Sequence, residues 1–207
     1  MAATSELDVA NLALQRIGVA PSSNLSGTDK ASVAANRILA DTRDEVQAMF
    51  PWNCIITREA LASTTIGSTF SAFSYVHTLG LSCLRVLDVI DVTDSGAENV
   101  PYRREYRNLY TDLSAGYVRY LKQTTNITPW DPLMLTAIET RMASKLAVWL
   151  TGKTQLAQMM YQEFLLTIST AVRMEAIEKK YEDTTKLLAM LNEQFIPALM
   201  NVKRVSE

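Results

Sequence analysis

The side chains best suited to chemistry are few in this chain of 207 residues, and they lie far apart in the sequence. His77 is the only histidine, so any acid–base scheme built on an imidazole would depend on this one residue. Cys54 and Cys83 form no CxxC motif and no cluster with histidine, as a zinc site would require. The sequence also contains no GxSxG, P-loop or GxGxxG motif. We therefore predict no catalytic residues, no metal and no cofactor.

Carboxylates are the remaining candidates for catalysis. Asp88 with Asp91, or Glu105 with Asp112, could form the acid pair of a glycoside hydrolase. The sequence gives no distance between these side chains, and carboxylates at strand ends and turns are commonly solvated. We expect a protein that is not an enzyme and keep a tail-associated glycan hydrolase as an alternative.

A basic and aromatic stretch comprises Tyr102, Arg103, Arg104, Tyr106 and Arg107. Such a mixture can stack on bases and bind phosphates, but it is also common in protein–protein interfaces. The formal net charge is -2, whereas proteins that grip nucleic acid through its phosphates carry a basic surplus. We therefore assign these residues to an interface, a channel surface or the surface of a sheet.

Helical periodicity at both ends of the chain predicts a mainly α fold of the α+β type, a helical bundle with a small inserted antiparallel β-region. Ser5 and Asp8 have the spacing of a capping box, and Asp131, which precedes a proline, is suited to a helix start. Gly18 and Gly152 are suited to left-handed helix ends. We expect helices at about 5–17, 28–50, 132–151 and 155–178, with the β-region at about 54–121.

Apolar residues at helical spacing predict the buried face of each helix, which in the third helix includes Leu146 and Trp149. Within the β-region, residues 63–74 are rich in Ser, Thr and Gly and are expected to form an exposed loop. Asp94-Ser95-Gly96 is expected to form a turn.

A second amphipathic segment closes the chain after a charged break at 178–183. We treat 1–180 as the body and 181–207 as a C-terminal helical extension. Its apolar face either docks in the groove of a partner or packs back on the chain's own helices. The residues assigned to docking are Leu187, Leu191, Phe195, Leu199, Val202, Lys203 and Arg204.

Several short motifs also occur in a recognisable order. They are Ala10-Asn11-Leu12-Ala13-Leu14-Gln15-Arg16-Ile17-Gly18, Glu45-Val46-Gln47 followed by Trp52, Cys83-Leu84-Arg85-Val86-Leu87-Asp88-Val89, Tyr117-Val118-Arg119-Tyr120-Leu121, Trp130-Asp131-Pro132-Leu133, and a helix with Ala143, Lys145, Leu146 and Ala147. This order resembles the head-to-tail adaptor family of short-tailed bacteriophages, also called tail tubular protein A or connector. The match covers most of the chain, but the residues after about Lys180 extend beyond the shortest family pattern.

The resemblance implies a structural virion protein at the head–tail junction, assembled in the host cytoplasm. It implies a homo-oligomeric ring, a dodecamer, that binds the portal protein and presents a platform for the nozzle or tail-tube protein. Viral DNA would pass through the ring during ejection without specific binding. The resemblance implies no catalysis and no membrane. A small helical binding protein unrelated to phage is the further alternative.

Overall fold

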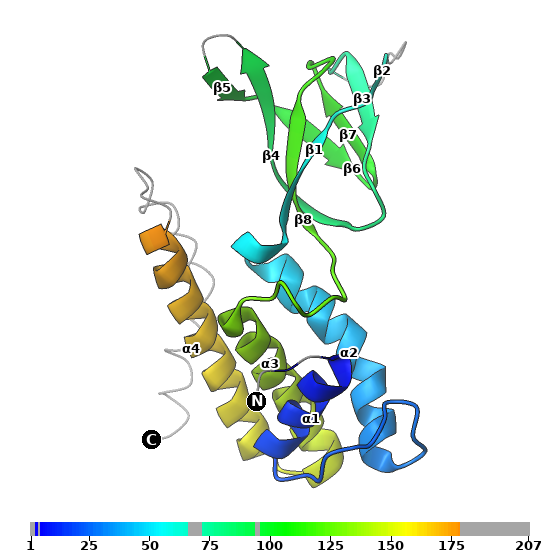
Figure 1. Ribbon diagram of the computed structural model, residues 1–207, viewed down its shortest axis with the longest axis vertical. Helices are drawn as coiled ribbons and strands as arrows, with labels where there is room; N and C mark the ends of the chain where they lie inside the picture. The colour runs from blue at the N-terminus through cyan, green and yellow to red at the C-terminus, as the bar shows by residue number, and fades with distance from the viewer. Residues whose placement is uncertain (1–2, 4, 66–71, 94–95, 179–207) are drawn as a thin grey trace. The chain divides into compact units, whose positions relative to one another are not determined.

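The computed structural model describes residues 3, 5–65, 72–93 and 96–178, and in them the chain forms four α-helices, one short 3-10 helix (Asn53–Ile55) and eight strands (Figure 1). The chain divides into two compact units. The helical unit comprises Met1–Val46 and Asn126–Glu207, and the β unit comprises Gln47–Thr125.

The prediction of a helical bundle with a small β-region is wrong. The β unit contains two four-stranded antiparallel sheets, ordered β1-β8-β4-β5 and β2-β3-β7-β6, so the fold is a mixed α+β fold. The strands are β1 (Ile56–Ala60), β2 (Ser63–Thr65), β3 (Tyr75–Thr78), β4 (Cys83–Thr93), β5 (Gly96–Asn99), β6 (Tyr102–Glu105), β7 (Asn108–Thr111) and β8 (Tyr117–Lys122).

The two sheets share one hydrophobic core. Strand β4 contributes Val86 and Val89, strand β7 contributes Leu109, and strand β8 contributes Val118 and Tyr120. Strand β7 alternates strictly between half-buried and buried residues, whereas β8 buries Leu121 as well as its neighbour Tyr120. The β unit therefore has a core of its own.

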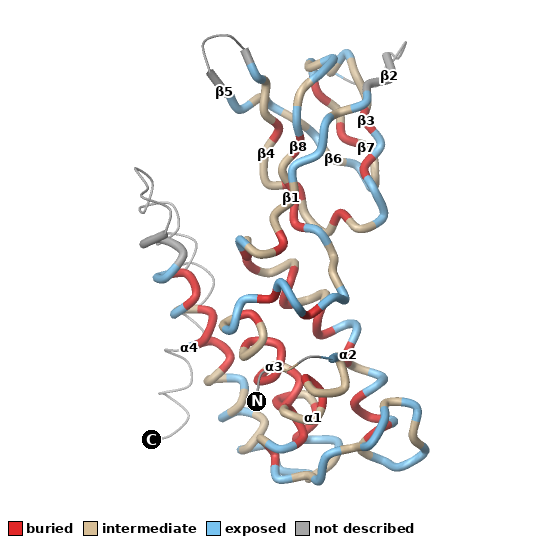
Figure 2. Tube along the Cα trace, viewed as in Figure 1, coloured by how far each residue is buried: buried red, intermediate tan, exposed pale blue. Residues whose placement is uncertain are grey.

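The helices of the helical unit are α1 (Glu6–Arg16), most of α2 (Lys30–Met49), α3 (Pro132–Thr151) and α4 (Thr154–Glu178). Helix α3 packs against both α1 and α4. It is buried along most of its length (Figure 2), with Met134, Ile138 and Met142 fully buried. Helix α3 is therefore the centre of this unit.

Short local sequence signals correctly predicted several helix ends. Ser5 and Asp8 form the expected capping box, and the Asp131 carboxylate accepts a hydrogen bond from the backbone N–H of Leu133 at 2.7 Å. Gly18 and Gly152 adopt positive φ angles of 73° and 69°, as left-handed helix ends require. These four predictions are confirmed.

Three other predictions need correction. Helix α2 begins at Lys30 instead of 28, because the Asp29 carboxylate caps it by accepting from the backbone N–H of Ser32 at 3.0 Å. The expected loop at 63–74 begins as strand β2, which pairs with β3. In the expected turn at 94–96, Gly96 already belongs to strand β5, and 94–95 lie outside the described residues.

Candidate functional site

The basic and aromatic stretch forms strand β6 and the turn that leads to β7. Its arginine side chains form hydrogen bonds or ion pairs with other groups of the same chain. The guanidinium of Arg104 donates to the carbonyl oxygens of Cys83 at 3.1 Å, Leu84 at 3.0 Å and Tyr106 at 3.0 Å. Because Cys83 and Leu84 belong to β4, this one side chain ties the edge of one sheet to the other sheet.

The other members of this stretch differ in their roles. Arg107 donates to the carbonyl of Leu79 at 3.1 Å, and Arg103 forms an exposed ion pair with Glu105 at 2.8 Å. The Tyr102 hydroxyl is half-buried, and burial raises the pKa of this phenol above its ordinary value. Arg104 and Arg107 are thus structural, which favours a sheet surface or interface over a phosphate-binding strip.

Tyr106 is the exception, because it points into solvent. It is 86% exposed and is the only non-glycine residue with a positive φ, 56°, among the described residues. Leu81, in the turn between β3 and β4, is 81% exposed. A backbone hydrogen bond of 2.8 Å from Leu79 to the Arg107 carbonyl holds these two turns side by side. We call Leu81 and Tyr106 the turn patch.

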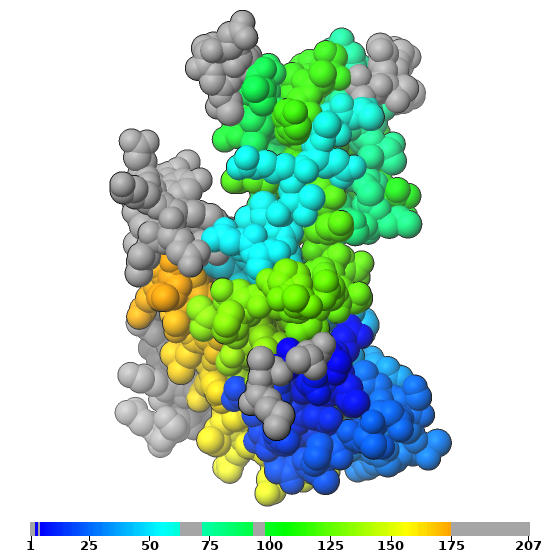
Figure 3. Space-filling view, viewed as in Figure 1, coloured from blue at the N-terminus to red at the C-terminus, as the bar shows by residue number. Residues whose placement is uncertain are grey.

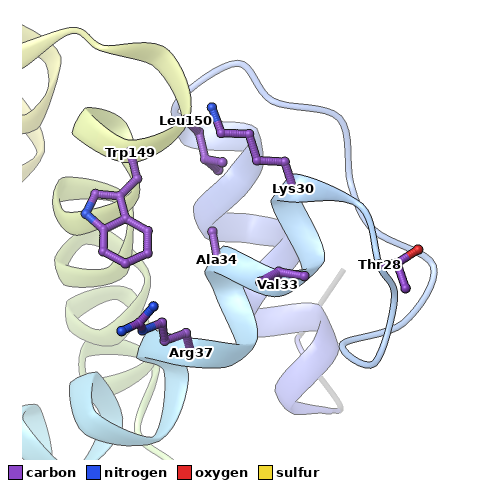
Figure 4. Close-up of a pocket in the computed structure, with 7 residues that line it drawn as sticks. All are labelled: Thr28, Lys30, Val33, Ala34, Arg37, Trp149 and Leu150. Atoms are coloured by element: carbon purple, nitrogen blue, oxygen red, sulfur yellow. The ribbon is translucent and has the colours of Figure 1, made fainter.

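A second apolar surface lies in the helical unit, between the start of α2 and the end of α3 (Figure 4). Trp149 was predicted to be buried, but it is 52% exposed and lines a hollow of about 400 Å³. The prediction failed because helical spacing places Trp149 near the buried stripe without revealing that α2 leaves this end of α3 open. The lining residues are Thr28, Lys30, Val33, Ala34, Arg37, Trp149 and Leu150.

The hollow has an apolar floor and a basic edge. The guanidinium carbon of Arg37 lies 5.5 Å from the centre of the Trp149 ring, which is within the range of a cation–π contact. In Figure 4, Trp149 from α3 and Arg37 from α2 lie on the same side of the hollow. Such a surface can accept an apolar side chain and, at its edge, a carbonyl or carboxylate oxygen.

Ion pairs connect the helices of this unit. Glu45 on α2 accepts from Arg141 and Lys145 on α3. Burial alone would raise the pKa of Glu45, but the hydrogen bonds from Lys145 and Arg141 outweigh it and lower the pKa. Glu139 is more deeply buried, and there burial outweighs the nearby Arg16, so the pKa of Glu139 is raised. These pairs position the helices that carry the hollow.

His77 is buried in the β unit. It lies on β3 with 1% of its surface exposed, and its Nε2–H donates to the Leu113 carbonyl at 3.0 Å. Its Nδ1 atom has no hydrogen-bond partner among the described residues. Cys83 is buried in the β core, which raises the pKa of its thiol above the ordinary value.

Neither carboxylate pair has the arrangement of a glycosidase. Asp88 is bound by Arg119 through two hydrogen bonds, and Asp91 lies three residues further along β4, on the opposite face of the strand. Glu105 lies at the turn end of the β6–β7 hairpin, while Asp112 follows Thr111 at the other end. At about 3.3 Å per residue, these two side chains are roughly 13 Å apart along the strands, beyond the spacing of an acid pair.

The outer face of α4 is a third apolar surface. Met159, Leu166 and Met174 are each more than half exposed, although each is a large apolar residue. Part of α4, in yellow to orange, is visible on the surface in Figure 3.

The expected docking residues, from Leu187 to Arg204, lie outside the described residues. Within the described part of the chain, no group of three or more His, Cys, Asp or Glu side chains could hold a metal ion. None of the described helices is both long and apolar enough to span a bilayer. No protein-family model matches the sequence, and no curated protein matches it.

Proposed function

We propose that this chain is a structural subunit of a homo-oligomeric ring, the head–tail adaptor of a short-tailed bacteriophage. The observation that carries the proposal is that each of the two units exposes an apolar surface of its own. The β unit has the turn patch, and the helical unit has the hollow beside Trp149. A closed ring requires two different surfaces on every subunit, because each subunit contacts its neighbours head to tail. The order of motifs in the sequence, which resembles that of head-to-tail adaptors, is the reason for assigning this ring to the head–tail junction.

The charge distribution agrees with a ring that lets DNA slide through it. The net charge of -2 provides no surplus of cations for the phosphates. Arg104 and Arg107 are engaged with backbone carbonyls, and Arg103 is paired with Glu105. If this stretch faced the lumen, its arginines would offer few free cations that could arrest moving DNA.

The ring would join the portal to the tail inside the virion. We assign the portal contact to the C-terminal segment that contains Leu187, Leu191, Phe195 and Leu199, because an amphipathic helix can lie in a partner's groove. The nozzle or tail-tube protein would bind elsewhere on the ring. Assembly would take place in the host cytoplasm, and the free subunit would form the ring only on the portal.

Mixing the purified protein with the portal protein of the same phage tests this proposal. Electron microscopy and analytical ultracentrifugation should show a ring on the portal and little association of the free chain. Replacing Leu81 and Tyr106 with serine should prevent the ring, whereas Gln158→Ala, at an exposed polar position on α4, should not. A protein that stays strictly monomeric with the portal present would refute the proposal.

The role of the C-terminal segment is tested separately. A chain truncated after Tyr181 should no longer join heads that contain the portal. If the truncated protein still joins them normally, the portal contact lies elsewhere, although the ring itself could still form.

A further inference from the structure

The hollow beside Trp149 has an apolar floor and two positive charges at its edge. Val33 and Trp149 are each just over half exposed there. Lys30 and Arg37 lie on either side of Val33 and Ala34 along α2 (Figure 4), and neither forms an ion pair with another described residue. None of the seven lining residues is acidic. The hollow is therefore suited to an apolar side chain that has a carboxylate beside it.

The turn patch of the same chain has this composition. Tyr106 projects into solvent next to Leu81, and it directly follows Glu105. Half of the Glu105 side chain is exposed, and its ion pair with Arg103 lies at the surface. Because a surface ion pair contributes little free energy, this carboxylate can exchange its partner for the cations of another surface at small cost.

The turn patch is also held in place before any contact forms. The Arg104 guanidinium donates to the carbonyl of Tyr106 at 3.0 Å, and Arg107 donates to the carbonyl of Leu79 at 3.1 Å. The backbone N–H of Leu79 donates to the carbonyl of Arg107 at 2.8 Å. A surface whose backbone is fixed in advance loses less conformational entropy when it binds.

Neither surface is suited to binding its own equivalent in a ring. Two hollows placed face to face would bring Lys30 and Arg37 of both copies together, and like charges oppose such a contact. Two turn patches placed face to face would form a two-fold contact, which is complete with two copies and builds no ring. A contact between the turn patch of one copy and the hollow of the next avoids both problems, because it repeats head to tail.

We propose that the turn patch of each subunit inserts into the hollow of its neighbour. The contact exists only if the chain forms the ring proposed above, and it identifies the two surfaces that meet in that ring. The Tyr106 ring packs on the exposed Trp149 ring, since aromatic pairs are favourable in stacked and edge-to-face arrangements. Glu105 lies toward Lys30 and Arg37 of the neighbour.

Two variants with one added cysteine each test the contact when they are mixed on the portal. Leu81→Cys leaves Tyr106 in place, and Val33→Cys leaves Trp149 in place. Both replaced residues are more than half exposed, so the cores of the two units stay intact. In the matched control, Gln158→Cys, at an exposed position on α4, replaces Val33→Cys.

Under mild oxidation, the Leu81→Cys and Val33→Cys chains should join at least about tenfold faster than the control pair. Peptide mapping separates this bond from bonds to Cys54 or Cys83. A rate no higher than that of the control, or bonds mainly between two Leu81→Cys chains, would overturn the contact. A ring seen by electron microscopy would then still support the adaptor function, whereas the absence of any ring on the portal would refute both.

Tryptophan fluorescence gives a second measurement on the unmodified chain. Trp52 and Trp130 are 2% and 8% exposed, whereas Trp149 is 52% exposed, so quenching by acrylamide reports mainly on Trp149. Ring formation should lower this quenching at least about twofold, because the contact covers the ring. A Trp149→Phe chain on the same portal measures the signal of the portal's own tryptophans. Unchanged quenching in the ring would overturn the contact, and so would shielding without the Leu81→Cys/Val33→Cys bond, because the portal would then fill the hollow.

Discussion

Replacing Glu45 with glutamine should destabilise the helical unit at neutral pH and have much less effect in acid. The Glu45 carboxylate accepts hydrogen bonds from Arg141 Nε at 2.9 Å, from Arg141 Nη2 at 2.6 Å and from Lys145 Nζ at 2.5 Å. Arg141 is itself held over the rings of Tyr161 and Phe164 on α4. The carboxylate therefore links α2 to the packed pair of α3 and α4.

The magnitude follows from these contacts. Hydrogen bonds to charged groups contribute about 1.5–3 kcal/mol each, but they are not additive, and solvent screens part of the interaction because the Glu45 side chain is 29% exposed. We expect Glu45→Gln to lower the free energy of unfolding by about 2 kcal/mol at neutral pH.

The pH dependence has a definite sign. The folded-state pKa of Glu45 lies below its unfolded value, because the bonds from Lys145 and Arg141 outweigh the opposing effect of burial. The stabilisation is therefore complete above the unfolded pKa and is lost as the pH falls through the folded pKa. Glutamine does not titrate, so the difference between the two proteins should shrink in acid.

Urea unfolding followed by far-ultraviolet circular dichroism is a suitable assay, because most of the helix lies in the helical unit. Glu139→Gln is the matched control, since burial raises the pKa of Glu139. The charge of Glu139 opposes folding above its folded pKa, and this penalty disappears below the unfolded pKa. Relative to the native protein, Glu139→Gln should therefore be most stabilising at neutral pH. If the Glu45→Gln difference stays constant with pH, or grows in acid, the ion-pair argument is wrong.

Three further predictions concern single residues. Arg104→Ala should lower the stability of the β unit by about 2–3 kcal/mol. Arg104→Lys should restore little of this stability, because an ammonium cannot reach three carbonyls. Hydrogen exchange of the β4 amides would measure the stability of both variants. Tyr106→Gly should raise stability by up to about 1 kcal/mol in urea unfolding, because glycine tolerates a positive φ, while weakening ring formation. Asp131→Ala should remove about 1 kcal/mol with the lost helix cap, measured by thermal unfolding.

The helix ends could be predicted from the sequence because the contacts that define them are local. The capping box at Ser5 and Asp8 spans three residues, and Gly18 ends α1 through its own backbone conformation. The start of α3 at Pro132 likewise depends on the single residue before it. Such signals do not require knowledge of any distant part of the chain.

The β-region expected at about 54–121 is close to the strands observed from Ile56 to Lys122, but their arrangement in two sheets could not be predicted, because the pairings are not local. Strand β3 pairs with β7 more than thirty residues later, and β1 pairs with β8 across about sixty residues. The sequence of β7, Asn108–Thr111, has one fully buried apolar residue, Leu109, and no hydrophobic run. Strand β2 consists only of serine and threonine residues, a composition that is equally typical of loops.

The roles of individual surface residues also could not be predicted from the sequence. Trp149 falls at the spacing of a buried position, and only the course of α2 leaves it exposed. Arg104 and Arg107 have the residue types of a phosphate-binding strip, but their partners are carbonyl oxygens of neighbouring strands and turns. The partners of a guanidinium depend on tertiary structure, and its residue type alone does not identify them.

The turn patch separates two properties of the basic and aromatic stretch, the charge of its arginines and the exposure of Tyr106. Two arginines hold the neighbouring turns, and Tyr106 adopts a left-handed conformation that costs a tyrosine about 1–2 kcal/mol relative to ordinary backbone. Glycine at this position would avoid that cost, and burying the ring would recover hydrophobic free energy. The fold does neither: Tyr106 is 86% exposed, and Leu81, in the neighbouring turn, is 81% exposed. Strained and exposed apolar side chains persist where a partner covers them, so the positioning of Tyr106 is a stronger argument for an interface than the charge of the arginines around it.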